Sequence, residues 1–504
     1  MSERIPPRRP LRRCALLAAV ALAAVAPGCG HRAPAPSAAH RGPIVLITID
    51  ALRADALGVF GGPPRLTPHL DELAHQASWA GRAISASSWT IPSMASIMTG
   101  LQVWRHGNWH GGRPVLAPEL ETLAEALKAR GYATAAFRSN HWLQEEYGYA
   151  QGFDVFRYLR EGRRAEQALS RLDGGPQFVW VHILPPHAPY VLHDNLVSRL
   201  DDPPSDLPRR VAPLDLEPYY DPSVPAPPEI LRRFRAMYWL NAAWADQIFG
   251  RMMAALRASG HFDDALVVVT SDHGEEFKEH GQVEHGGNLG RALIEVPLIV
   301  KLPKGSTRRL AIPAGSRPAN LRVYATLVEA AGGQPGPNVA PSLFTATPGP
   351  VLSELYLGDG SNDFSLVVGD RQLLWQSRFA VPDAEFYRAK FESLGGAPRP
   401  ALREPPDTIF ARQGAAFDRT LPLTGARDLP PTFRLEQWTA DGRSVAIQDA
   451  AATDRMAREL RALWLLLNGP ETLPSQRTAL ARPKLSPEDE AELRALGYVG
   501  GGPP

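Results

Sequence analysis

Short apolar runs that recur along the chain limit its fold more than any other sequence feature. The first, IVLITI from Ile44 to Ile49, lacks polar alternation and is rich in β-branched residues. Such a run is typical of a strand buried on both faces, as in a parallel sheet. Similar runs lie at Tyr132 to Phe137, Phe178 to Leu184 and Ala265 to Thr270. We therefore expect several strands to lie side by side in one covered sheet.

Helical segments alternate with these runs. A helix is expected to open at Thr67-Pro68, with threonine as N-cap and proline at the first helical position. The segments LETLAEALKAR and FRAMYWLNAAWADQIFGRMMAALRAS also have strong helical character. The alternation predicts an α/β fold, a mostly parallel sheet sandwiched by helices, over residues 43–335. Sites in such folds form beyond the carboxyl ends of the strands.

Two regions depart from this rhythm. Residues 200–228 are crowded with prolines and acidic residues, which indicates a surface insertion. From about residue 336, strand-like pieces such as FSLVVGDRQLLWQ precede a proline-broken stretch and one long helix, ATDRMARELRALWLLLNG. We expect residues 336–504 to form a smaller C-terminal α+β subdomain and a tail.

The first residues have the features of an export signal. A basic stretch from Arg4 to Arg13 precedes an apolar run from Ala15 to Ala26, which is shorter than the roughly 20 residues that span a bilayer. Small residues then lead to Cys29, as in a bacterial lipoprotein signal whose cysteine is acylated. We predict a signal peptide of the lipoprotein type at residues 1–29.

Export has two consequences for the mature chain. Acylation of Cys29 would anchor the protein to a membrane, and the Ala- and Pro-rich residues 30–42 would act as a tether. The protein would then be periplasmic or on the cell surface. The alternative is ordinary cleavage after Ala26, with an incidental cysteine.

Charge and cysteine content exclude several classes of function. The formal net charge of the 504 residues is +1, so no global field draws the chain to nucleic acid, and we expect no nucleic-acid partner. The two cysteines, Cys14 and Cys29, both precede residue 30. The body therefore has no disulfide framework, no cysteine-based zinc site and no cysteine nucleophile.

Three polar clusters fall where expected strands end. Asp50 directly follows the first strand, Thr90 stands in SSWTIPS before a helical segment, and Asp272-His273 follow ALVVVT. Carboxylates and a histidine at strand ends suit a divalent cation, and a hydroxyl at a helix start suits a nucleophile. Taken alone, Asp50 could be only a helix cap and Thr90 only an N-cap, whereas Asp272-His273 at a strand end is more suggestive of function. Their joint occurrence in this order favours a site.

These clusters lie in segments that resemble the sulfatase family, within the sulfatase and alkaline phosphatase superfamily. ITIDALRADALGVFGGPPRLTPHLDELA and SSWTIPSMASIMTGLQVWRHG resemble its N-terminal part. VHILPPHAPY resembles its middle histidine block, and TSDHGEEFKEHGQVEHGGNL its second metal-binding block. The ending LSPEDEAELRALGYVG also resembles bacterial members. The resemblance runs from about residue 43 to the end and implies an alkaline-phosphatase-like fold.

The resemblance assigns a metal site and a nucleophile. It implies that Asp50, Asp272 and His273 are metal ligands, and that Thr90 is the nucleophile and also touches the metal. Arg53 would lie beside the nucleophile and stabilise charge. Zinc or manganese is favoured as the divalent ion, with calcium or magnesium as alternatives.

Further polar residues follow from the same resemblance. His187 and His285 would contact the transferred group or protonate the leaving group. Asn140 and His182 are substrate-binding candidates, although a histidine within a strand is often only a satisfied core residue.

Departures from the family pattern decide which chemistry is expected. Sulfatases convert the Cys or Ser of Cys-x-Pro-Ser-x-Arg to formylglycine, whereas this chain has Thr90-Ile-Pro92-Ser93-Met-Ala95. Threonine is a secondary alcohol, so no formylglycine is expected, and the arginine of the motif is missing. Arg138-Ser139-Asn140-His141 replaces the family's Gly-Lys-x-His block, and His285 replaces a later lysine.

We therefore expect a metal-dependent hydrolase that cleaves sulfate or phosphate esters by attack of metal-bound Thr90. Phosphate-ester hydrolysis or phosphoryl-group transfer is favoured, because threonine nucleophiles occur in phosphodiesterases and head-group transferases of the superfamily. Two alternatives stay open: sulfuric ester hydrolysis by direct attack of threonine, and a catalytically silent binding protein on the same scaffold. The substrate would be a small-molecule, glycan or lipid ester.

Overall fold

A computed structural model describes residues 39–108, 115–159, 163–222, 224–346, 349–356, 362–376, 433–439 and 443–468. These residues belong to one compact unit that begins at Ala39. The predicted signal peptide, Cys29, residues 30–38 of the tether and the tail beyond residue 468 lie outside the described residues. Within the described part, no helix combines the length and the apolar character needed to cross a bilayer.

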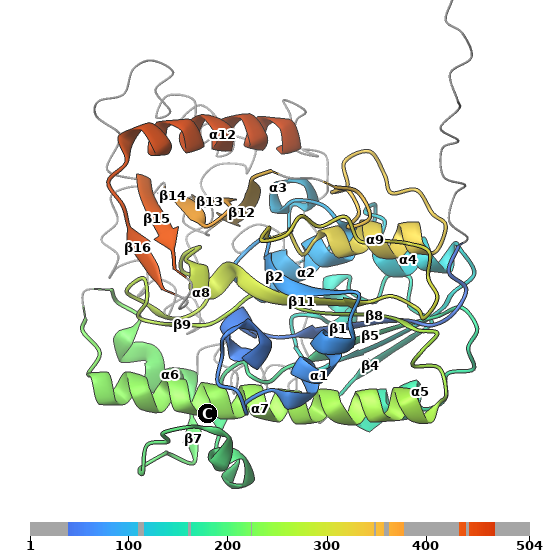
Figure 1. Ribbon diagram of the computed structural model, residues 1–504, viewed down its shortest axis with the longest axis horizontal. Coiled ribbons are helices and arrows are strands. Elements are labelled where there is room, and N and C mark those ends of the chain that lie inside the picture. The colour runs from blue at the N-terminus through green and yellow to red at the C-terminus, as the bar shows by residue number, and fades with distance from the viewer. Residues whose placement is uncertain are drawn as a thin grey trace, which may run out of the picture. The chain divides into compact units, whose positions relative to one another are not determined.

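A seven-stranded sheet forms the centre of this unit (Figure 1). Its spatial order is β2-β11-β8-β1-β5-β3-β4, and all pairs are parallel except those made by β11. The strands are β1 (Ile44–Ile49), β2 (Trp79–Ile84), β3 (Ala133–Arg138), β4 (Val155–Tyr158), β5 (Gln177–Ile183), β8 (Leu266–Ser271) and β11 (Glu295–Lys301). The expected mostly parallel sheet is confirmed.

Helices cover both faces of the sheet (Figure 1). Alternate residues of β1 explain why its sequence is apolar throughout: Val45, Ile47 and Ile49 pack in one core, whereas Ile44 and Leu46 pack in the other. The first core includes α1 (Pro68–Gln76), α5 (Arg163–Leu169) and α7 (Pro228–Ala258). The second includes α2 (Thr90–Thr99), α4 (Leu123–Lys128) and α9 (Arg322–Ala330).

The N-terminal ends of α4 and α1 are capped in different ways. Thr122 caps α4 through a capping box with Glu125. Thr67 precedes α1 as expected, but its hydroxyl makes no cap and instead donates to the carbonyl of Ala56 at 3.3 Å. Asp246 of α7 caps α1 instead: its carboxylate accepts a hydrogen bond from the amide of Leu70 at 2.9 Å.

A second sheet follows the main one in sequence. It is antiparallel, with the order β12-β13-β14-β15-β16, and α12 (Ala450–Asn468) contacts it. The strands are β12 (Val351–Tyr356), β13 (Asn362–Val368), β14 (Arg371–Gln376), β15 (Phe433–Trp438) and β16 (Ser444–Ala446). This arrangement confirms a smaller C-terminal α+β part.

Short elements complete the described chain. They lie mainly in the loops that leave the main sheet and in residues 190–220. They are α3 (Val103–His106), β6 (Tyr190–Val191), β7 (Arg210–Val211), α6 (Pro213–Leu216), β9 (Glu276–Phe277), β10 (Val283–Glu284), α8 (Arg291–Ile294) and the 3-10 turns at Ala54–Ala56, Gly58–Phe60, Glu145–Tyr147, Asp194–Arg199 and Glu217–Tyr219.

Candidate active site

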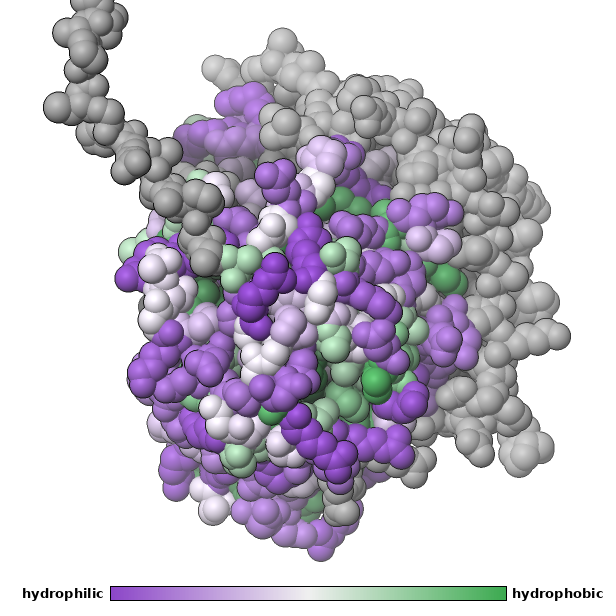
Figure 2. All heavy atoms as spheres, turned by 90° about the vertical axis from the view of Figure 1, so that its right-hand side faces the viewer, coloured by the Kyte–Doolittle hydropathy of each residue, from purple (hydrophilic) through white to green (hydrophobic). Residues whose placement is uncertain are grey.

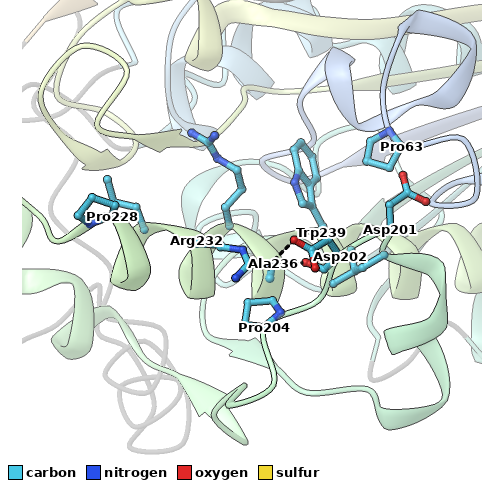
Figure 3. Close-up of a pocket in the computed structure, with 11 residues that line it drawn as sticks. Pro63, Asp201, Asp202, Pro204, Pro228, Arg232, Ala236 and Trp239 are labelled. Atoms are coloured by element: carbon cyan, nitrogen blue, oxygen red, sulfur yellow. Dashed lines mark hydrogen bonds and ion pairs between the residues drawn. The ribbon is translucent and has the colours of Figure 1, made fainter.

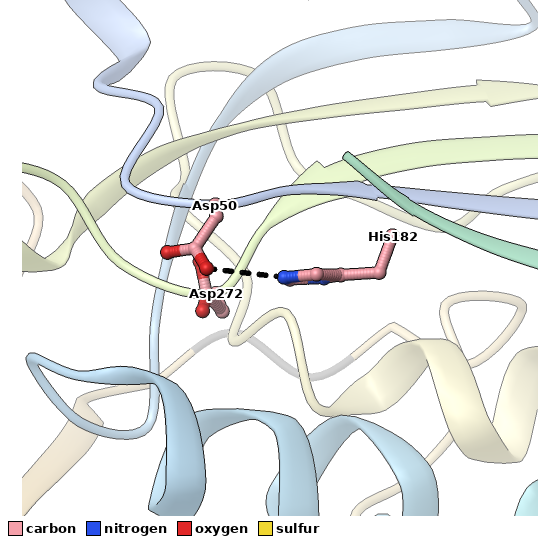
Figure 4. Close-up of side chains that lie close together, drawn as sticks. All are labelled: Asp50, His182 and Asp272. Carbon is pink, nitrogen blue, oxygen red and sulfur yellow. Dashed lines mark hydrogen bonds and ion pairs between the residues drawn. The ribbon is translucent and has the colours of Figure 1, made fainter. Parts of the chain in front are cut away.

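Three neighbouring strands bring ligand-type side chains to one edge of the main sheet. Asp50 directly follows β1, and Asp272 directly follows β8. Because Ile49 pairs in register with Ser271, the two aspartates leave the sheet side by side. His182 lies in the adjacent strand β5. Ligand atoms of Asp50, His182 and Asp272 lie within 4.8 Å of one another (Figure 4).

One carboxylate oxygen of Asp50 accepts hydrogen bonds from two neighbouring side chains. Its Oδ2 accepts hydrogen bonds from Asn140 Nδ2 at 2.6 Å and from His182 Nε2 at 3.1 Å. The other ring nitrogen, His182 Nδ1, accepts from the Thr48 hydroxyl at 2.8 Å. Thr48 Oγ1 in turn accepts from Trp180 Nε1 at 3.0 Å. This buried series of hydrogen bonds fixes both the tautomer of His182 and the orientation of Asp50.

Asn140 and His182 therefore make contacts that differ from their predicted contact with substrate. Both side chains are fully buried and bond to Asp50. His182 belongs to the compact group of ligand-type residues, but both of its nitrogens are already hydrogen-bonded. We therefore infer that it orients a ligand and is not itself the nitrogen ligand.

The side chains of Asp50, Asp272, His273 and Thr90 converge at the same edge of the sheet. Asp50 Oδ1 and Asp272 Oδ2 are buried and have no hydrogen-bond partner among the described residues. His273 Nε2 lies 3.4 Å from the first oxygen and 3.5 Å from the second. Thr90 Oγ1 lies 3.3 Å from the same nitrogen. His273 Nδ1 donates to the carbonyl of Gly274 at 2.8 Å, so in the neutral ring Nε2 carries the lone pair.

A divalent cation fits this arrangement. Two carboxylate oxygens and an imidazole lone pair repel one another in a dry interior, whereas a shared cation satisfies all three. Burial and the neighbouring charge of Asp50 raise the pKa of Asp272, which reflects that repulsion. The converging side chains, Asp50, Thr90, Asp272 and His273, are the four predicted metal ligands. Their oxygen and nitrogen atoms are ligand types that divalent metal ions accept in proteins.

Thr90 is placed by the start of a helix. It is the first residue of α2 and is buried. Unpaired backbone amides at a helix start favour an anionic group nearby. The second sheet holds the loop before Thr90, because the amide of Glu354 donates to the carbonyl of Ala86 at 2.8 Å and Ser353 Oγ donates to the carbonyl of Ser85 at 2.7 Å.

Of the two predicted acid–base histidines, His285 lies beside His273, and His187 lies beside His285. The ring centre of His285 is 4.4 Å from that of His273 and 4.8 Å from that of His187. Nδ1 of His285 lies 3.0 Å from Glu275 Oε1, and the Tyr190 hydroxyl donates to Glu275 Oε2 at 3.0 Å. Burial and the neighbouring charge of Glu284 raise the pKa of Glu275 well above its usual value. Its contact with Nδ1 orients the ring of His285 and leaves Nε2 outside this contact.

The sequence prediction omitted Glu275 and Gly274. Glu275 is fully buried and follows the Asp-His-Gly segment, and this position in the sequence was the available signal. Gly274 is required on steric grounds, because a Cβ atom there would collide with the carbonyl of Ala292. Its amide donates to the carbonyl of Leu293 at 2.7 Å, which holds the segment that carries His273.

Arg53 forms different contacts from those expected. Its guanidinium makes ion pairs with Asp55 and Glu279, each at 2.7 Å, and Nη1 donates to the carbonyl of Glu275 at 3.0 Å. These carboxylates hold the pKa of Arg53 well above its usual value despite burial. Arg53 therefore supports the loop that carries Glu275, and its predicted contact with the transferred group stays a prediction.

We expect Thr48→Val to weaken cation binding about tenfold, because it removes the hydroxyl that orients His182 and, through it, Asp50. Calorimetric titration with zinc or manganese measures the affinity. The matched control is Thr270→Val, which lies opposite Thr48 on β8, is equally buried and donates to the carbonyl of Pro297. Equal loss of affinity in both variants would contradict the assigned role of Thr48.

Comparison with known protein families matches most of the main domain. The family model described as Sulfatase matches residues 43–167 and 162–333, which together exceed half of the chain. Both matched segments include residues of the converging site, with Asp50 and Thr90 in the first and Asp272 and His273 in the second.

Curated relatives share modest identity. An ulvan-active sulfatase of Formosa agariphila is 27% identical over 300 residues, which cover 52% of this chain and 56% of that protein. Human iduronate 2-sulfatase is 24% identical over 367 residues, which cover 59% of this chain and 66% of that protein. The matches thus span between about half and two thirds of the length of these relatives.

A solved structure with a similar fold covers more of the chain. The phosphonate monoester hydrolase SpPMH of Silicibacter pomeroyi superposes with a TM-score of 0.56 at 18% identity, covering 88% of this chain and 100% of that one. This likeness establishes a shared fold, including the expected alkaline-phosphatase-like arrangement of the main sheet.

Proposed function

The chain belongs to the sulfatase family, and on that premise we propose that it is a metal-dependent hydrolase of sulfuric or phosphoric esters with Thr90 as nucleophile. The observation that carries the proposal is the convergence of Thr90 Oγ1, His273 Nε2, Asp50 Oδ1 and Asp272 Oδ2. A hydroxyl beside buried ligand atoms that lack hydrogen-bond partners has the composition of a metal-assisted nucleophilic site.

The residues of the chain have separate tasks in the proposed reaction. A divalent cation held by Asp50, Asp272 and His273 would lower the pKa of the Thr90 hydroxyl and offset the charge of the transferred group. Thr90 Oγ releases its proton to solvent and forms a bond to phosphorus or sulfur, and the bond to the ester oxygen breaks. The leaving oxygen takes a proton from His187 or His285. Water then attacks the threonine ester: its oxygen bonds to phosphorus or sulfur, one of its protons returns to Thr90 Oγ, and the phosphate or sulfate product leaves.

We favour a phosphoric ester, or transfer of a phosphoryl group, over a sulfuric ester. A threonine cannot form the aldehyde of formylglycine, so the attacking group is an ordinary alkoxide. The sulfuric ester is the second candidate, since the curated relatives with the names given above are sulfatases. A glycan ester is the proposed substrate class, because ulvan and iduronate in those names are carbohydrates.

Export and lipid anchoring at Cys29 remain part of the proposal. They rest on the basic and apolar pattern of the first residues. Cells that express the wild type or Cys29→Ser are labelled with a radioactive fatty acid. If Cys29 is acylated, the wild-type chain carries the label and the variant does not.

We expect the purified full chain to contain bound zinc or manganese and to turn over an aryl phosphate or a bis-aryl phosphate faster than an aryl sulfate. Elemental analysis measures the metal, and release of the aryl alcohol measures turnover of each substrate. If the protein cleaves the aryl sulfate and neither phosphate substrate, the proposed substrate becomes a sulfuric ester. A chain that holds no stoichiometric metal and cleaves none of the three substrates would favour the silent scaffold.

A further inference from the structure

A cavity of about 580 Å³ lies at the edge of the main sheet opposite the candidate active site. The turn after β11, which ends at Lys301, forms one wall, and residues 262 and 263, just before β8, contribute to another. Because β1 and β8 are parallel, their first residues lie at this edge, whereas Asp50 and Asp272 lie at the other. Six strand residues separate the two edges, which is about 20 Å at the usual rise per residue.

Positive charge dominates the lining of this cavity, which we call the basic cavity. It has four cationic side chains and one carboxylate: Lys301, Lys304, Arg308, Arg309 and Asp263. The ammonium of Lys301 is buried and donates to three backbone carbonyls, so the fold itself satisfies it. Lys304 pairs with Asp263 at 3.0 Å, but these side chains are 79% and 58% exposed, and a pair as exposed as this contributes little. Lys304 is therefore available to an external anion.

The two arginines of the basic cavity are held in different ways. Arg308 pairs with Glu329 at 3.3 Å, and its side chain is 15% exposed. Arg309 is exposed, and its Nη1 donates to the carbonyls of Ser306 and Arg308 in the same loop. In the described part of the chain, Arg309 makes no ion pair with a carboxylate. A guanidinium with donors to spare suits a phosphate group.

A second cavity, of about 450 Å³, has a different charge (Figure 3). It lies along the first turns of α7, and its lining has two arginines and two aspartates: Asp201, Asp202, Arg232 and Arg235. Arg232 and Asp202 form an ion pair at 2.6 Å. The basic cavity lies beyond the other end of α7, a helix of 31 residues and about 46 Å. The excess of positive charge is thus a property of the basic cavity and is not shared by the cavity along α7.

The described chain enters its compact unit beside the basic cavity. The unit begins at Ala39, and the amide of the next residue, His40, donates to the carbonyl of Ala330 at 2.8 Å. Arg308 Nη2 donates to the carbonyl of Glu329 at 2.9 Å. Figure 1 shows the blue start of the described chain at the right, and Figure 2 shows that this side of the molecule is mostly hydrophilic. The entry point and the basic cavity therefore share the C-terminal end of α9.

The predicted anchor limits which face of the unit can meet a membrane. Cys29 lies ten residues before Ala39, and ten extended residues span at most about 35 Å. This reach is shorter than α7, so a membrane that holds Cys29 would lie nearer to the basic cavity than to the cavity of Figure 3. Anionic lipids attract lysine and arginine side chains near their surface, and each such side chain strengthens binding about fivefold.

We propose that the basic cavity is the surface by which the domain docks on an anionic membrane, with Lys304 and Arg309 on the phosphate groups of the lipids. The proposal goes beyond the ester hydrolase and takes from the predicted anchor only the identity of the partner surface. Docking at this edge of the sheet turns the opposite edge, with Asp50 and Thr90, away from the membrane. The site then receives esters from the aqueous phase, with no need to extract them from the bilayer.

The test uses a chain that starts at residue 30, because residues 39–504 form a compact unit of their own. This chain lacks the acylation site and the basic and apolar signal segment, which would bind lipid by themselves. Co-sedimentation compares vesicles of phosphatidylglycerol and phosphatidylcholine with vesicles of phosphatidylcholine alone. We expect binding to the anionic vesicles only. Lys304→Gln together with Arg309→Gln should weaken it about 25-fold, fivefold for each cation.

The matched control removes two cations from the first turns of α7. Arg232→Gln together with Arg233→Gln changes the net charge equally, and these side chains are 53% and 33% exposed, so vesicle binding should not change. An equal loss in both double variants, or no binding by the parent chain, would overturn the proposal. Glycerol 3-phosphate that binds as tightly as the vesicles would also overturn it, in favour of a site for a free anion.

The outcome is independent of the proposed hydrolase. Vesicle binding that depends on Lys304 and Arg309 in a chain that cleaves no ester would reject the hydrolase and retain the docking surface. An active hydrolase whose vesicle binding is the same in the parent and in the Lys304 and Arg309 double variant would reject the docking surface alone.

Discussion

Thr90→Ala should lose about four or more orders of magnitude in kcat on whichever ester the wild type cleaves. The variant removes the one hydroxyl that lies 3.3 Å from His273 Nε2 and leaves the carboxylates in place. Because Thr90 begins α2 and its hydroxyl makes no helix cap, the helix itself should persist. Release of the aryl alcohol under saturating substrate gives kcat for both proteins.

Thr90→Ser is the matched variant for this experiment. Serine keeps the hydroxyl at the same atom, so its kcat should stay within roughly tenfold of wild type. After rapid acid quench, wild type and Thr90→Ser should carry a covalent phosphoryl or sulfuryl group on residue 90 by mass spectrometry. A Thr90→Ala protein that retains more than a hundredth of wild-type turnover would show that another group attacks.

Asp272→Asn should abolish the stabilisation of the fold by zinc or manganese. The amide oxygen can keep the hydrogen bonds that Asp272 Oδ1 accepts from the amides of Ala51 and His273, at 3.2 and 2.9 Å. Its nitrogen replaces Oδ2, which lies 3.5 Å from His273 Nε2, and can donate a proton to that lone pair. At a concentration a hundredfold above Kd, a cation stabilises the wild type by about 2.7 kcal/mol, and the variant should lose this gain.

The same substitution should have the opposite effect without the cation. In a chelator, wild-type Asp50 and Asp272 repel each other in a fully buried site, and burial with that repulsion raises the pKa of Asp272. Asp272→Asn removes the repulsion, so its melting temperature in chelator should exceed that of the wild type. Melting temperatures of the wild type and Asp272→Asn, each measured with the metal and with a chelator, test both expectations. An equal cation-dependent shift in both proteins would place the metal elsewhere.

The fold was predictable where local sequence determines structure. The apolar run of β1 extends over the predicted residues, because both of its faces enter a core. The long helix α7 begins at Pro228, earlier than its apolar pattern, since its first turns line an exposed groove and carry polar residues. The missing cap at Thr67 was unpredictable because Asp246, far along the chain, takes its place.

The site was predictable only in part. The order of Asp50, Thr90, Asp272 and His273 along the chain pointed to residues that the structure brings together. Their supporting residues depend on contacts across strands and loops, which spacing does not reveal. His182 reaches Asp50 through the register of β5 against β1, and Arg53 meets Glu279 across the loop after β8.

The position of β1 between β5 and β8 has a consequence for biosynthesis. Asp50 is made early, but it is oriented by a residue of β5, and its companion Asp272 follows a strand made much later. A ribosome must therefore complete more than half of the chain before both carboxylates can be in place for the proposed cation. Binding of the proposed cation would then be a late step of biosynthesis, and the ion acquired would depend on the supply in the compartment where folding ends.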